Sequence, residues 1–356
     1  MFIVVMIAII GYVFFMPSEQ EDFSAYYYAA KVILDPQAPS NAVYDLDFAR
    51  KNYCNYNIDA PLRPYIYSVA AAYIFAPIAL LPFQAAKLIF NYICLALYIM
   101  AIAVTAIYAN GPHKKQLLLL LTIALMWLPF LNGLTLYQIN PLLLFILSVA
   151  VLAATRNHPV LSGVLLGFAS LFKLFPLLIA MALGVKNWRI FTGCIVVFMT
   201  SFFIPGSFDW FPAISHITRN YTVFYRLGYL WYGIYLGCVV AVMGVTFFRT
   251  RSENYGLISA LSVPAVLLIM PIVEYNHLTL LIFSYIYIWI NLTNWPGWFW
   301  AAATVSFLII QVYKLCPYIS YIVGLLILWF SFVLVSNRKY PLPEIEQPLK
   351  PCGGQS

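Results

Sequence analysis

The sequence predicts an all-helical integral membrane protein that crosses the bilayer many times. Three observations carry this prediction. The chain is 63% hydrophobic, only 9% of its residues are charged, and its mean hydropathy is +0.87; an average soluble domain is about 25% charged. The apolar residues form long runs, and the Lys and Arg residues lie mostly between them. Many Tyr and Trp residues lie near the ends of the runs, as expected at the two membrane interfaces.

The positive charge does not indicate nucleic-acid binding. The net charge of +7 comes from dispersed residues, with no Lys/Arg run longer than two. This distribution is typical of the excess of basic residues in cytoplasmic loops. The six cysteines are scattered and none form a CxxC pair, so neither a zinc site nor a disulfide framework is predicted.

The apolar runs are the expected helices. The first run lacks a basic leading region and a small-residue cleavage site, so we expect an uncleaved helix rather than a signal peptide. It is short for a span of about 20 residues, which would fit a start further upstream. In chain order the runs are 2–16, 65–82, 84–109, 116–132, 140–155, 159–185, 190–205, 229–248, 255–271, 277–292, 298–313 and 318–335.

The basic connectors set the predicted topology. They are 113–115, 156, 186–189, 249–251 and 338–339, and the positive-inside rule places all of them in the cytoplasm. The segment 17–63 is then external. The run 65–82, which contains Pro77 and Pro82, cannot be a full crossing, so we expect a re-entrant or membrane-surface helix.

The run 159–185 has basic connectors at both ends, so it should enter the membrane and return. We expect the turn near Phe172–Pro176, where Pro176 interrupts the helical hydrogen bonds. A single long tilted helix is the alternative. The whole chain is then expected to make about 12 crossings with both termini in the cytoplasm. We expect one transmembrane domain, 1–338, with external loops 17–63 and 206–228, followed by a disordered cytoplasmic tail, 339–356.

This topology gathers the unusual polar residues at the external face. Ionisable groups at membrane depth are costly, and they predict function. Each has a plainer interpretation. Asp22 could simply cap the helix that follows it, and Lys173 could extend to the interface. The residues come from five separate segments: Asp22, Gln138, Asn140, Lys173, Arg219, Arg226, Glu274 and His277.

A possible metal motif lies in the first external loop. Asp45-Leu46-Asp47 resembles a DxD metal site, but a three-residue match in an acidic loop is a weak indication. We expect no cofactor, and leave a divalent metal open.

The order of the motifs resembles glycosyltransferase family 87, whose members are membrane mannosyltransferases of the GT-C type. The resemblance runs from about residue 20 to 290. Tyr137 stands where the family usually has Gly, the second proline of a Tyr-Pro-Pro segment is missing, and only one His stands in the last turn. The matching segments are Asp22–Ala30, Arg63–Tyr67, Ala76–Pro82, Tyr137–Asn140, Gly163–Pro176 and Met270–His277.

The resemblance implies a donor, an acceptor and a location. The donor is a polyprenyl-phosphate sugar, in particular polyprenyl-phosphate mannose, and the acceptor is a hydroxyl of a lipid or glycan. Transfer inverts the anomeric carbon on the external, periplasmic face of a bacterial inner membrane. Such a protein has membrane lipids and no nucleic acid as partners.

The resemblance and the chemistry together assign residue roles. An inverting transfer needs one carboxylate to accept the proton of the attacking hydroxyl, and Asp22 is the expected base. A leaving phosphate needs cations instead of a second carboxylate. The expected phosphate-binding residues are Lys173, Arg63, Arg219, Arg226 and His277. The expected sugar- or acceptor-binding residues are Tyr26, Tyr27, Gln138, Asn140 and Glu274.

A transporter or flippase of lipid-linked sugars is the alternative function. Transporters usually place their polar site near the bilayer midplane and are often built from repeats. This chain shows no internal repeat, collects its polar residues at one face and has a long external loop. These features favour an enzyme.

Overall fold

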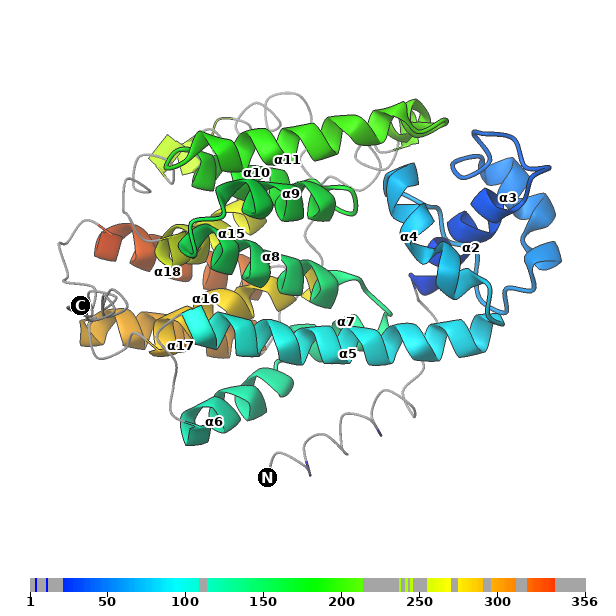
Figure 1. Ribbon diagram of the computed structural model, residues 1–356. Coiled ribbons are helices and arrows are strands. Elements are labelled where there is room, and N and C mark those ends of the chain that lie inside the picture. Colours follow the sequence, from blue (N-terminus) through cyan, green and yellow to red (C-terminus); the bar gives the residue numbers. More distant parts are fainter. Residues whose placement is uncertain are drawn as a thin grey trace, which may run out of the picture.

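The computed structural model of the chain describes residues 22–108, 114–213, 255–269, 275–290, 296–311 and 319–336, with isolated positions at 4, 11, 237, 241, 242, 244 and 245. All regular structure in these residues is helical, and they contain no strand. Figure 1 shows a helical bundle with a small group of helices at one end. The predicted first helix, most of the run 229–248 and the tail 339–356 lie outside the described residues.

The small group at the end of the bundle is formed by α2 (Phe23–Leu34), α3 (Leu46–Asn52), η1 (Cys54–Tyr56) and α4 (Val69–Ala79). α4 begins where the Ser68 hydroxyl accepts a hydrogen bond from the backbone N–H of Ala71. Its 11 residues give a length of about 16 Å, against an apolar bilayer thickness of about 30 Å. This length agrees with the prediction that 65–82 is not a full crossing.

α5 (Phe83–Tyr108) is the long helix of the bundle, and α6 (Lys114–Leu125) and α7 (Leu128–Thr135) follow it. The predicted run 116–132 is not one continuous helix, because α6 and α7 are bent by 54° at a break, but the two together are long and apolar enough for one span. Pro129 lies in the first turn of α7, where its missing N–H costs no hydrogen bond. Trp127 is extended at the break, and its indole N–H donates to the carbonyl of Leu278.

α8 (Asn140–Thr155), α9 (Pro159–Ser170), α10 (Phe175–Gly184) and α11 (Trp188–Thr200) come next. Added side chains at Gly163 and Gly167 would collide with the carbonyls of Ile190 and Cys194, so α9 and α11 are parallel and packed backbone to backbone. An added side chain at Gly184 would meet Phe191, so the end of α10 returns to the start of α11. The predicted hairpin over 159–185 is therefore confirmed.

α11 continues into η2 (Ser201–Phe203), and the chain then bends by 110° into the segment that begins with η3 (Ser207–Asp209). This bend brings the chain back to the first external loop. The indole N–H of Trp210 donates to the carbonyl of Ile66 at 2.8 Å. Of the predicted loop 206–228, residues 214–228 lie outside the described part.

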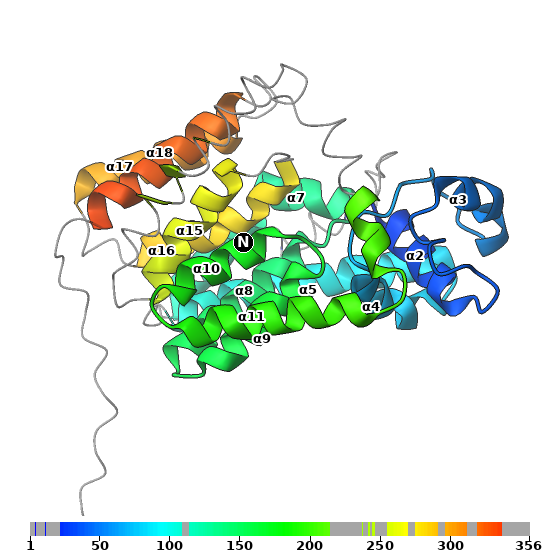
Figure 2. The ribbon, with the colours of Figure 1, turned by 90° about the horizontal axis from the view of Figure 1, so that it is seen from above.

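The C-terminal part comprises α15 (Tyr255–Ile269), η4 (Tyr275–Leu280), α16 (Leu281–Ile290), α17 (Gly297–Gln311) and α18 (Ile319–Ser336). Seen from above, α17 and α18 lie together on one side of the bundle, and α9 and α11 lie on the other (Figure 2). α15 contacts both α10 and α18, so it joins the two sides.

The described helices do not reach the predicted number of about twelve crossings. Within the described residues, Phe83–Ile107 is long and apolar enough to cross a membrane, and two bent pairs of helices would add two more spans. The other apolar helices have 10–17 residues. The runs 116–132 and 159–185 are each divided into two helices, whereas α8, α15 and α17 are about as long as the apolar runs predicted for them.

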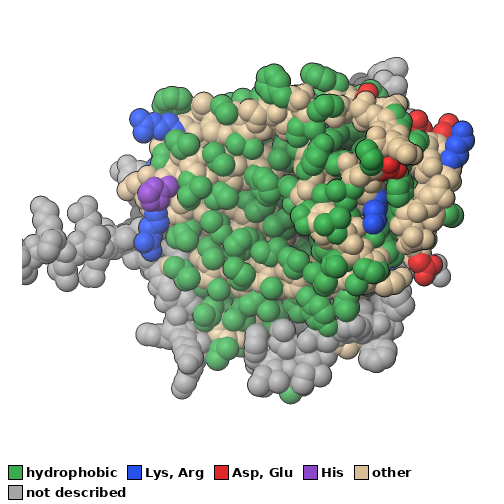
Figure 3. Space-filling view, turned by 45° about the vertical axis from the view of Figure 1, so that its right-hand side comes forward, with side chains coloured by type: hydrophobic (Ala, Val, Ile, Leu, Met, Phe, Trp, Pro, Cys, Tyr) green, Lys and Arg blue, Asp and Glu red, His purple; other side chains and the backbone are tan. Residues whose placement is uncertain are grey.

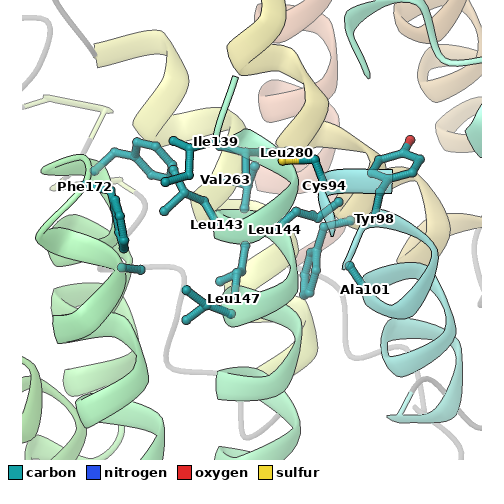
Figure 4. Close-up of a cluster of buried hydrophobic side chains, with 14 of the residues drawn as sticks. Cys94, Tyr98, Ala101, Ile139, Leu143, Leu144, Leu147, Phe172, Val263 and Leu280 are labelled. Carbon is teal, nitrogen blue, oxygen red and sulfur yellow. The ribbon is translucent and has the colours of Figure 1, made fainter. Parts of the chain in front are cut away.

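α8 lies at the centre of the bundle. Leu143, Leu144 and Leu147 are buried, with α5 on one side of them and Phe172 on the other (Figure 4). A helix that is apolar around its whole circumference is expected at such a position. The site described below lies at the N-terminal end of this central helix.

Charged residues mark the two ends of the bundle. Hydrophobic side chains cover the middle of the face shown in Figure 3, and charged side chains lie towards its two ends. Arg156, Lys186 and Arg189 lie where α8 and α10 end and where α9 and α11 begin; we call this the Arg156 end. Every Asp of the described residues lies at the other end, which we call the Asp22 end: Asp22, Asp35, Asp45, Asp47, Asp59 and Asp209.

Candidate functional site

The turn between α7 and α8 organises the candidate site. α7 ends with two hydrogen bonds: the Gln138 N–H donates to the Gly133 carbonyl at 2.8 Å, and the Tyr137 N–H donates to the Leu134 carbonyl at 3.2 Å. This pair is the Schellman motif, which satisfies the last carbonyls of a helix. α8 then begins at Asn140. The turn therefore fixes Gln138 and Asn140 between two helix ends.

Asp22 is attached to this turn by its backbone and its side chain. Its N–H donates to the carbonyl of Leu136 at 3.0 Å. Its half-buried carboxylate accepts a hydrogen bond from Nε2 of Gln138 and makes no capping bond to α2. The interpretation of Asp22 as a simple helix cap is therefore excluded.

The two polar groups of the Gln138 side-chain amide differ: the nitrogen has a partner among the described residues, and the oxygen does not. A carboxylate only accepts, so the NH₂ group must face Asp22. The carbonyl oxygen Oε1 is buried and has no hydrogen-bond partner among the described residues. Gln138 is only 2% exposed. A buried unpaired oxygen beside the candidate base is a position where a ligand hydroxyl could donate.

Lys173 lies in the hairpin turn between α9 and α10. Its half-buried ammonium donates to Oδ1 of Asn140 at 3.0 Å. The amide nitrogen of Asn140 donates to Asn276, to the side-chain oxygen at 2.8 Å and to the backbone carbonyl at 3.0 Å. Both asparagines are buried. Because Asn276 occupies the NH₂ group of Asn140, the oxygen of Asn140 is turned towards Lys173.

His277 belongs to the same cluster. It is buried in η4 next to Asn276, and its ring lies close enough to Lys173 for their charges to interact. Gly133 lies between Gln138 and Asn276 and connects the Asp22 pair with the Lys173 pair. An added Cβ at Gly133 would lie 3.8 Å from Cβ of Asn276 and 3.9 Å from Cβ of Gln138. Asp22, Gln138, Asn140, Lys173 and His277 therefore form one connected cluster at the Asp22 end.

Arg63 lies beside the start of α2. The Ser24 hydroxyl donates to the carbonyl of Pro61 at 3.2 Å, and the hydroxyls of Tyr26 and Tyr67 are 3.0 Å apart. Arg63 lies in the sequence between Pro61 and Tyr67, which make these two contacts. Its Nε is buried and lacks a hydrogen-bond partner within the part of the chain that the structure describes. This is a second cation on the same side of the bundle, with an unused donor.

Comparisons with known proteins assign the chain to a family. The model of glycosyltransferase family 87 matches residues 65–271, more than half of the chain. This chain belongs to glycosyltransferase family 87. No curated protein and no solved structure matches it.

Membership of glycosyltransferase family 87 makes the chain a membrane enzyme that transfers a sugar from a donor to an acceptor. The matched range contains Gln138, Asn140 and Lys173. Asp22, Arg63 and His277 lie outside it. The structure brings Asp22 and His277 to the matched residues through the contacts described above.

Tyr26 and Tyr27 have a packing role in this family 87 enzyme. Both rings are buried. Tyr26 stacks on Phe75 with 4.8 Å between ring centroids, and the Tyr27 hydroxyl donates to the carbonyl of Leu81 at 2.7 Å. Burial, the Tyr67 hydroxyl and the charge of Asp22 raise the pKa of Tyr26 well above its usual value, so it stays neutral. The predicted stacking of a sugar on these two rings finds no open ring face here.

The DxD segment is used by the fold of the external loop. Asp45 caps α3 by accepting from the N–H groups of Asp47 and Phe48, and Asp47 pairs with Arg50 at 3.2 Å. The described residues contain no group of three or more His, Cys, Asp or Glu that could hold a metal ion.

Three predicted site residues, Arg219, Arg226 and Glu274, lie outside the described residues. Asn276 was missed. It stands in the predicted turn beside His277, but the sequence does not reveal that its side chain matches Asn140, which is 136 residues away. Only the folded chain shows this pairing.

Proposed function

We propose that this glycosyltransferase moves a hexose, mannose in particular, from a polyprenyl-phosphate donor to an acceptor hydroxyl, with inversion at the anomeric carbon. The observation that carries the proposal is the pairing of Asp22 with Gln138 and of Lys173 with Asn140, two positions apart in one turn. A carboxylate and an ammonium, the two groups that such a transfer needs, are thereby held close together.

Asp22 is the general base of the proposed reaction. The acceptor oxygen forms a bond to the anomeric carbon while its proton passes to the Asp22 carboxylate. Gln138 Nε2 donates to that carboxylate and fixes its orientation. The unpaired Oε1 of Gln138 accepts a hydrogen bond from a hydroxyl of the bound acceptor.

The leaving group is the polyprenyl phosphate. The bond between the anomeric carbon and the phosphate oxygen breaks, and the electron pair stays with the phosphate. Lys173 stabilises this charge, and Asn140 and Asn276 hold the ammonium in place. Arg63, with its unused Nε donor, and His277 assist in binding the phosphate.

The reaction takes place at the external face of the membrane. The proposal is supported by the short connectors at the end opposite to Asp22, which carry Arg156, Lys186 and Arg189 and no acidic residue, whereas acidic and basic residues are mixed at the Asp22 end. The positive-inside rule assigns such a basic end to the cytoplasm. A lipid-linked donor would then reach the site at Asp22 from the external leaflet.

The donor class can be tested with purified enzyme in nanodiscs. Radiolabelled polyprenyl-phosphate mannose, polyprenyl-phosphate glucose and GDP-mannose are offered separately, together with a total lipid and glycan extract as acceptor. We expect labelled product from a polyprenyl-phosphate sugar, with the anomer inverted relative to the donor. Product from GDP-mannose alone, or retention of the donor's anomeric configuration, would contradict the proposal.

A further inference from the structure

Tyr137 has a backbone conformation that is unusual for its residue type. Its φ is +54°, in the left-handed region. It occupies the position after the C-cap in the Schellman motif of α7, where the two hydrogen bonds from Tyr137 and Gln138 close the helix. Glycine is usual at this position, because a Cβ is disfavoured in the left-handed conformation.

The central helix α8 also ends in a Schellman motif, and there the left-handed position is held by an asparagine. α8 ends with the His158 N–H donating to the Ala153 carbonyl at 2.8 Å, and Asn157 has a φ of +62°. Asn tolerates this conformation far better than a bulky aromatic residue. Among the described non-glycine residues with positive φ, which are Asn57, Tyr137 and Asn157, only the tyrosine is unsuited to it.

The backbone of Tyr137 lies in the turn that holds the candidate base. Tyr137 separates Leu136 from Gln138, the two residues that hold the backbone and the carboxylate of Asp22. The ring is half-buried, and the ammonium of Lys87 lies 4.4 Å from its centroid. A cation over an aromatic ring fixes the orientation of both groups. Strained residues with an oriented side chain are characteristic of binding sites.

The geometry points to Tyr137 as a specificity-determining residue that stacks on a sugar ring of the acceptor. This inference rests on the proposed function and narrows it: the acceptor is a glycoside or glycolipid, and not a plain lipid alcohol. Aromatic side chains offer an apolar face with fixed geometry to such a ring.

The arrangement of the turn assigns the ring to the acceptor and not to the donor. The attacking hydroxyl must lie at Asp22, and Tyr137 stands between the two residues that contact Asp22. The donor phosphate would lie at Lys173, which is bound to Asn140 on the other side of Gln138. A ring stacked on Tyr137 therefore belongs to the molecule that carries the attacking hydroxyl.

The inference is tested by saturation-transfer NMR on the full-length enzyme in lipid nanodiscs, with methyl α-D-mannopyranoside and methyl α-D-glucopyranoside as soluble probes and 1-propanol as an alcohol without a ring. Wild type and Tyr137→Phe should saturate the ring protons of at least one glycoside and not those of propanol. Tyr137→Asn and Tyr137→Gly suit the left-handed backbone and lack the ring. Both should bind that glycoside roughly two- to tenfold more weakly.

Asn157→Gly is the matched control, because it changes the same motif at the opposite end and should leave glycoside binding unchanged. The binding measurement contains no donor and involves no transfer, so a failure of the proposed chemistry is separable from a failure of this inference. Equal glycoside binding by wild type and the two ring-less variants would overturn the inference. An absence of glycoside binding to wild type would overturn it as well.

Discussion

Asp22 and Lys173 are held by the same turn, although 151 positions separate them in the sequence: the carboxylate accepts from Gln138 and the ammonium donates to Asn140, two residues further on. Gln138 and Asn140 are both buried, so the turn acts as a rigid base for the two charged groups.

Gln138→Leu should lower the turnover number while leaving donor affinity unchanged. The variant keeps the volume of the side chain and removes the donor that orients the Asp22 carboxylate. We expect turnover to fall roughly 10- to 100-fold, as for the loss of one orienting hydrogen bond of about 1.5–3 kcal/mol. Steady-state kinetics with a labelled polyprenyl-phosphate sugar measure both quantities. Gln84→Leu, at an exposed position of α5, is the control; an equal loss in both variants would contradict the orienting role.

Lys173→Met should weaken donor binding. The substitution keeps the length of the side chain and removes the cation proposed to bind the phosphate. A charged hydrogen bond of about 1.5–3 kcal/mol corresponds to roughly a 10- to 100-fold loss in affinity. Equilibrium binding of the labelled donor gives the value. Lys186→Met removes a lysine at the Arg156 end, where its ammonium lies 4.2 Å from the ring of Tyr255, and should have no effect. Unchanged affinity in Lys173→Met would place the phosphate elsewhere.

Asn276→Ala should affect both stability and donor binding. It removes the side-chain oxygen that accepts from Asn140 inside the protein, and a buried donor left without its partner costs about 1–3 kcal/mol. Asn140 would keep its bond to the backbone carbonyl of residue 276, but its oxygen would be held less firmly towards Lys173. Thermal unfolding and donor binding are measured on the same preparation. Asn55→Ala, which removes an exposed hydrogen bond, should change neither; a variant of Asn276 that only loses stability would reduce Asn276 to a packing residue.

The sequence pattern was sufficient for the helical class, for the break in 159–185 and for the gathering of Asp22, Gln138, Asn140, Lys173 and His277. These follow from apolar runs, prolines and the placement of basic residues, all of which are local in the sequence. The bend between α6 and α7 was missed although Pro129 marks it, because a proline in a first turn looks the same as one inside an apolar run.

Features that depend on contacts between side chains far apart in the sequence could not be predicted from the sequence. Tyr26 and Tyr27 look like sugar-stacking rings, but the Tyr26 ring stacks on Phe75 and the Tyr27 hydroxyl donates to the carbonyl of Leu81. Asn276 looks like an ordinary turn residue until its partner Asn140 is known. The left-handed φ of Tyr137 is also invisible in the sequence, because the residue type argues against it.

The two ends of the bundle should be reached from opposite sides of the membrane. Cys54 is exposed at the Asp22 end, and Cys94 and Cys194 are buried. In a variant with Ser at 238, 316 and 352, a membrane-impermeant maleimide added to intact spheroplasts should label Cys54. With Cys54 also replaced by Ser, an added Asn157→Cys at the Arg156 end should react only after permeabilisation. The reverse pattern would put the site on the cytoplasmic face.

In the proposed reaction Asp22 removes the proton of the acceptor hydroxyl, and replacing Asp22 by Asn tests this step. Asp22→Asn keeps the size of the side chain but cannot act as a base, while Asp47→Asn changes an exposed aspartate that pairs with Arg50. Single-turnover transfer from polyprenyl-phosphate mannose is measured together with equilibrium donor binding. We predict that Asp22→Asn transfers at least about 100-fold more slowly with donor affinity unchanged, and that Asp47→Asn behaves as wild type. Near-normal transfer by Asp22→Asn would show that Asp22 is not the base.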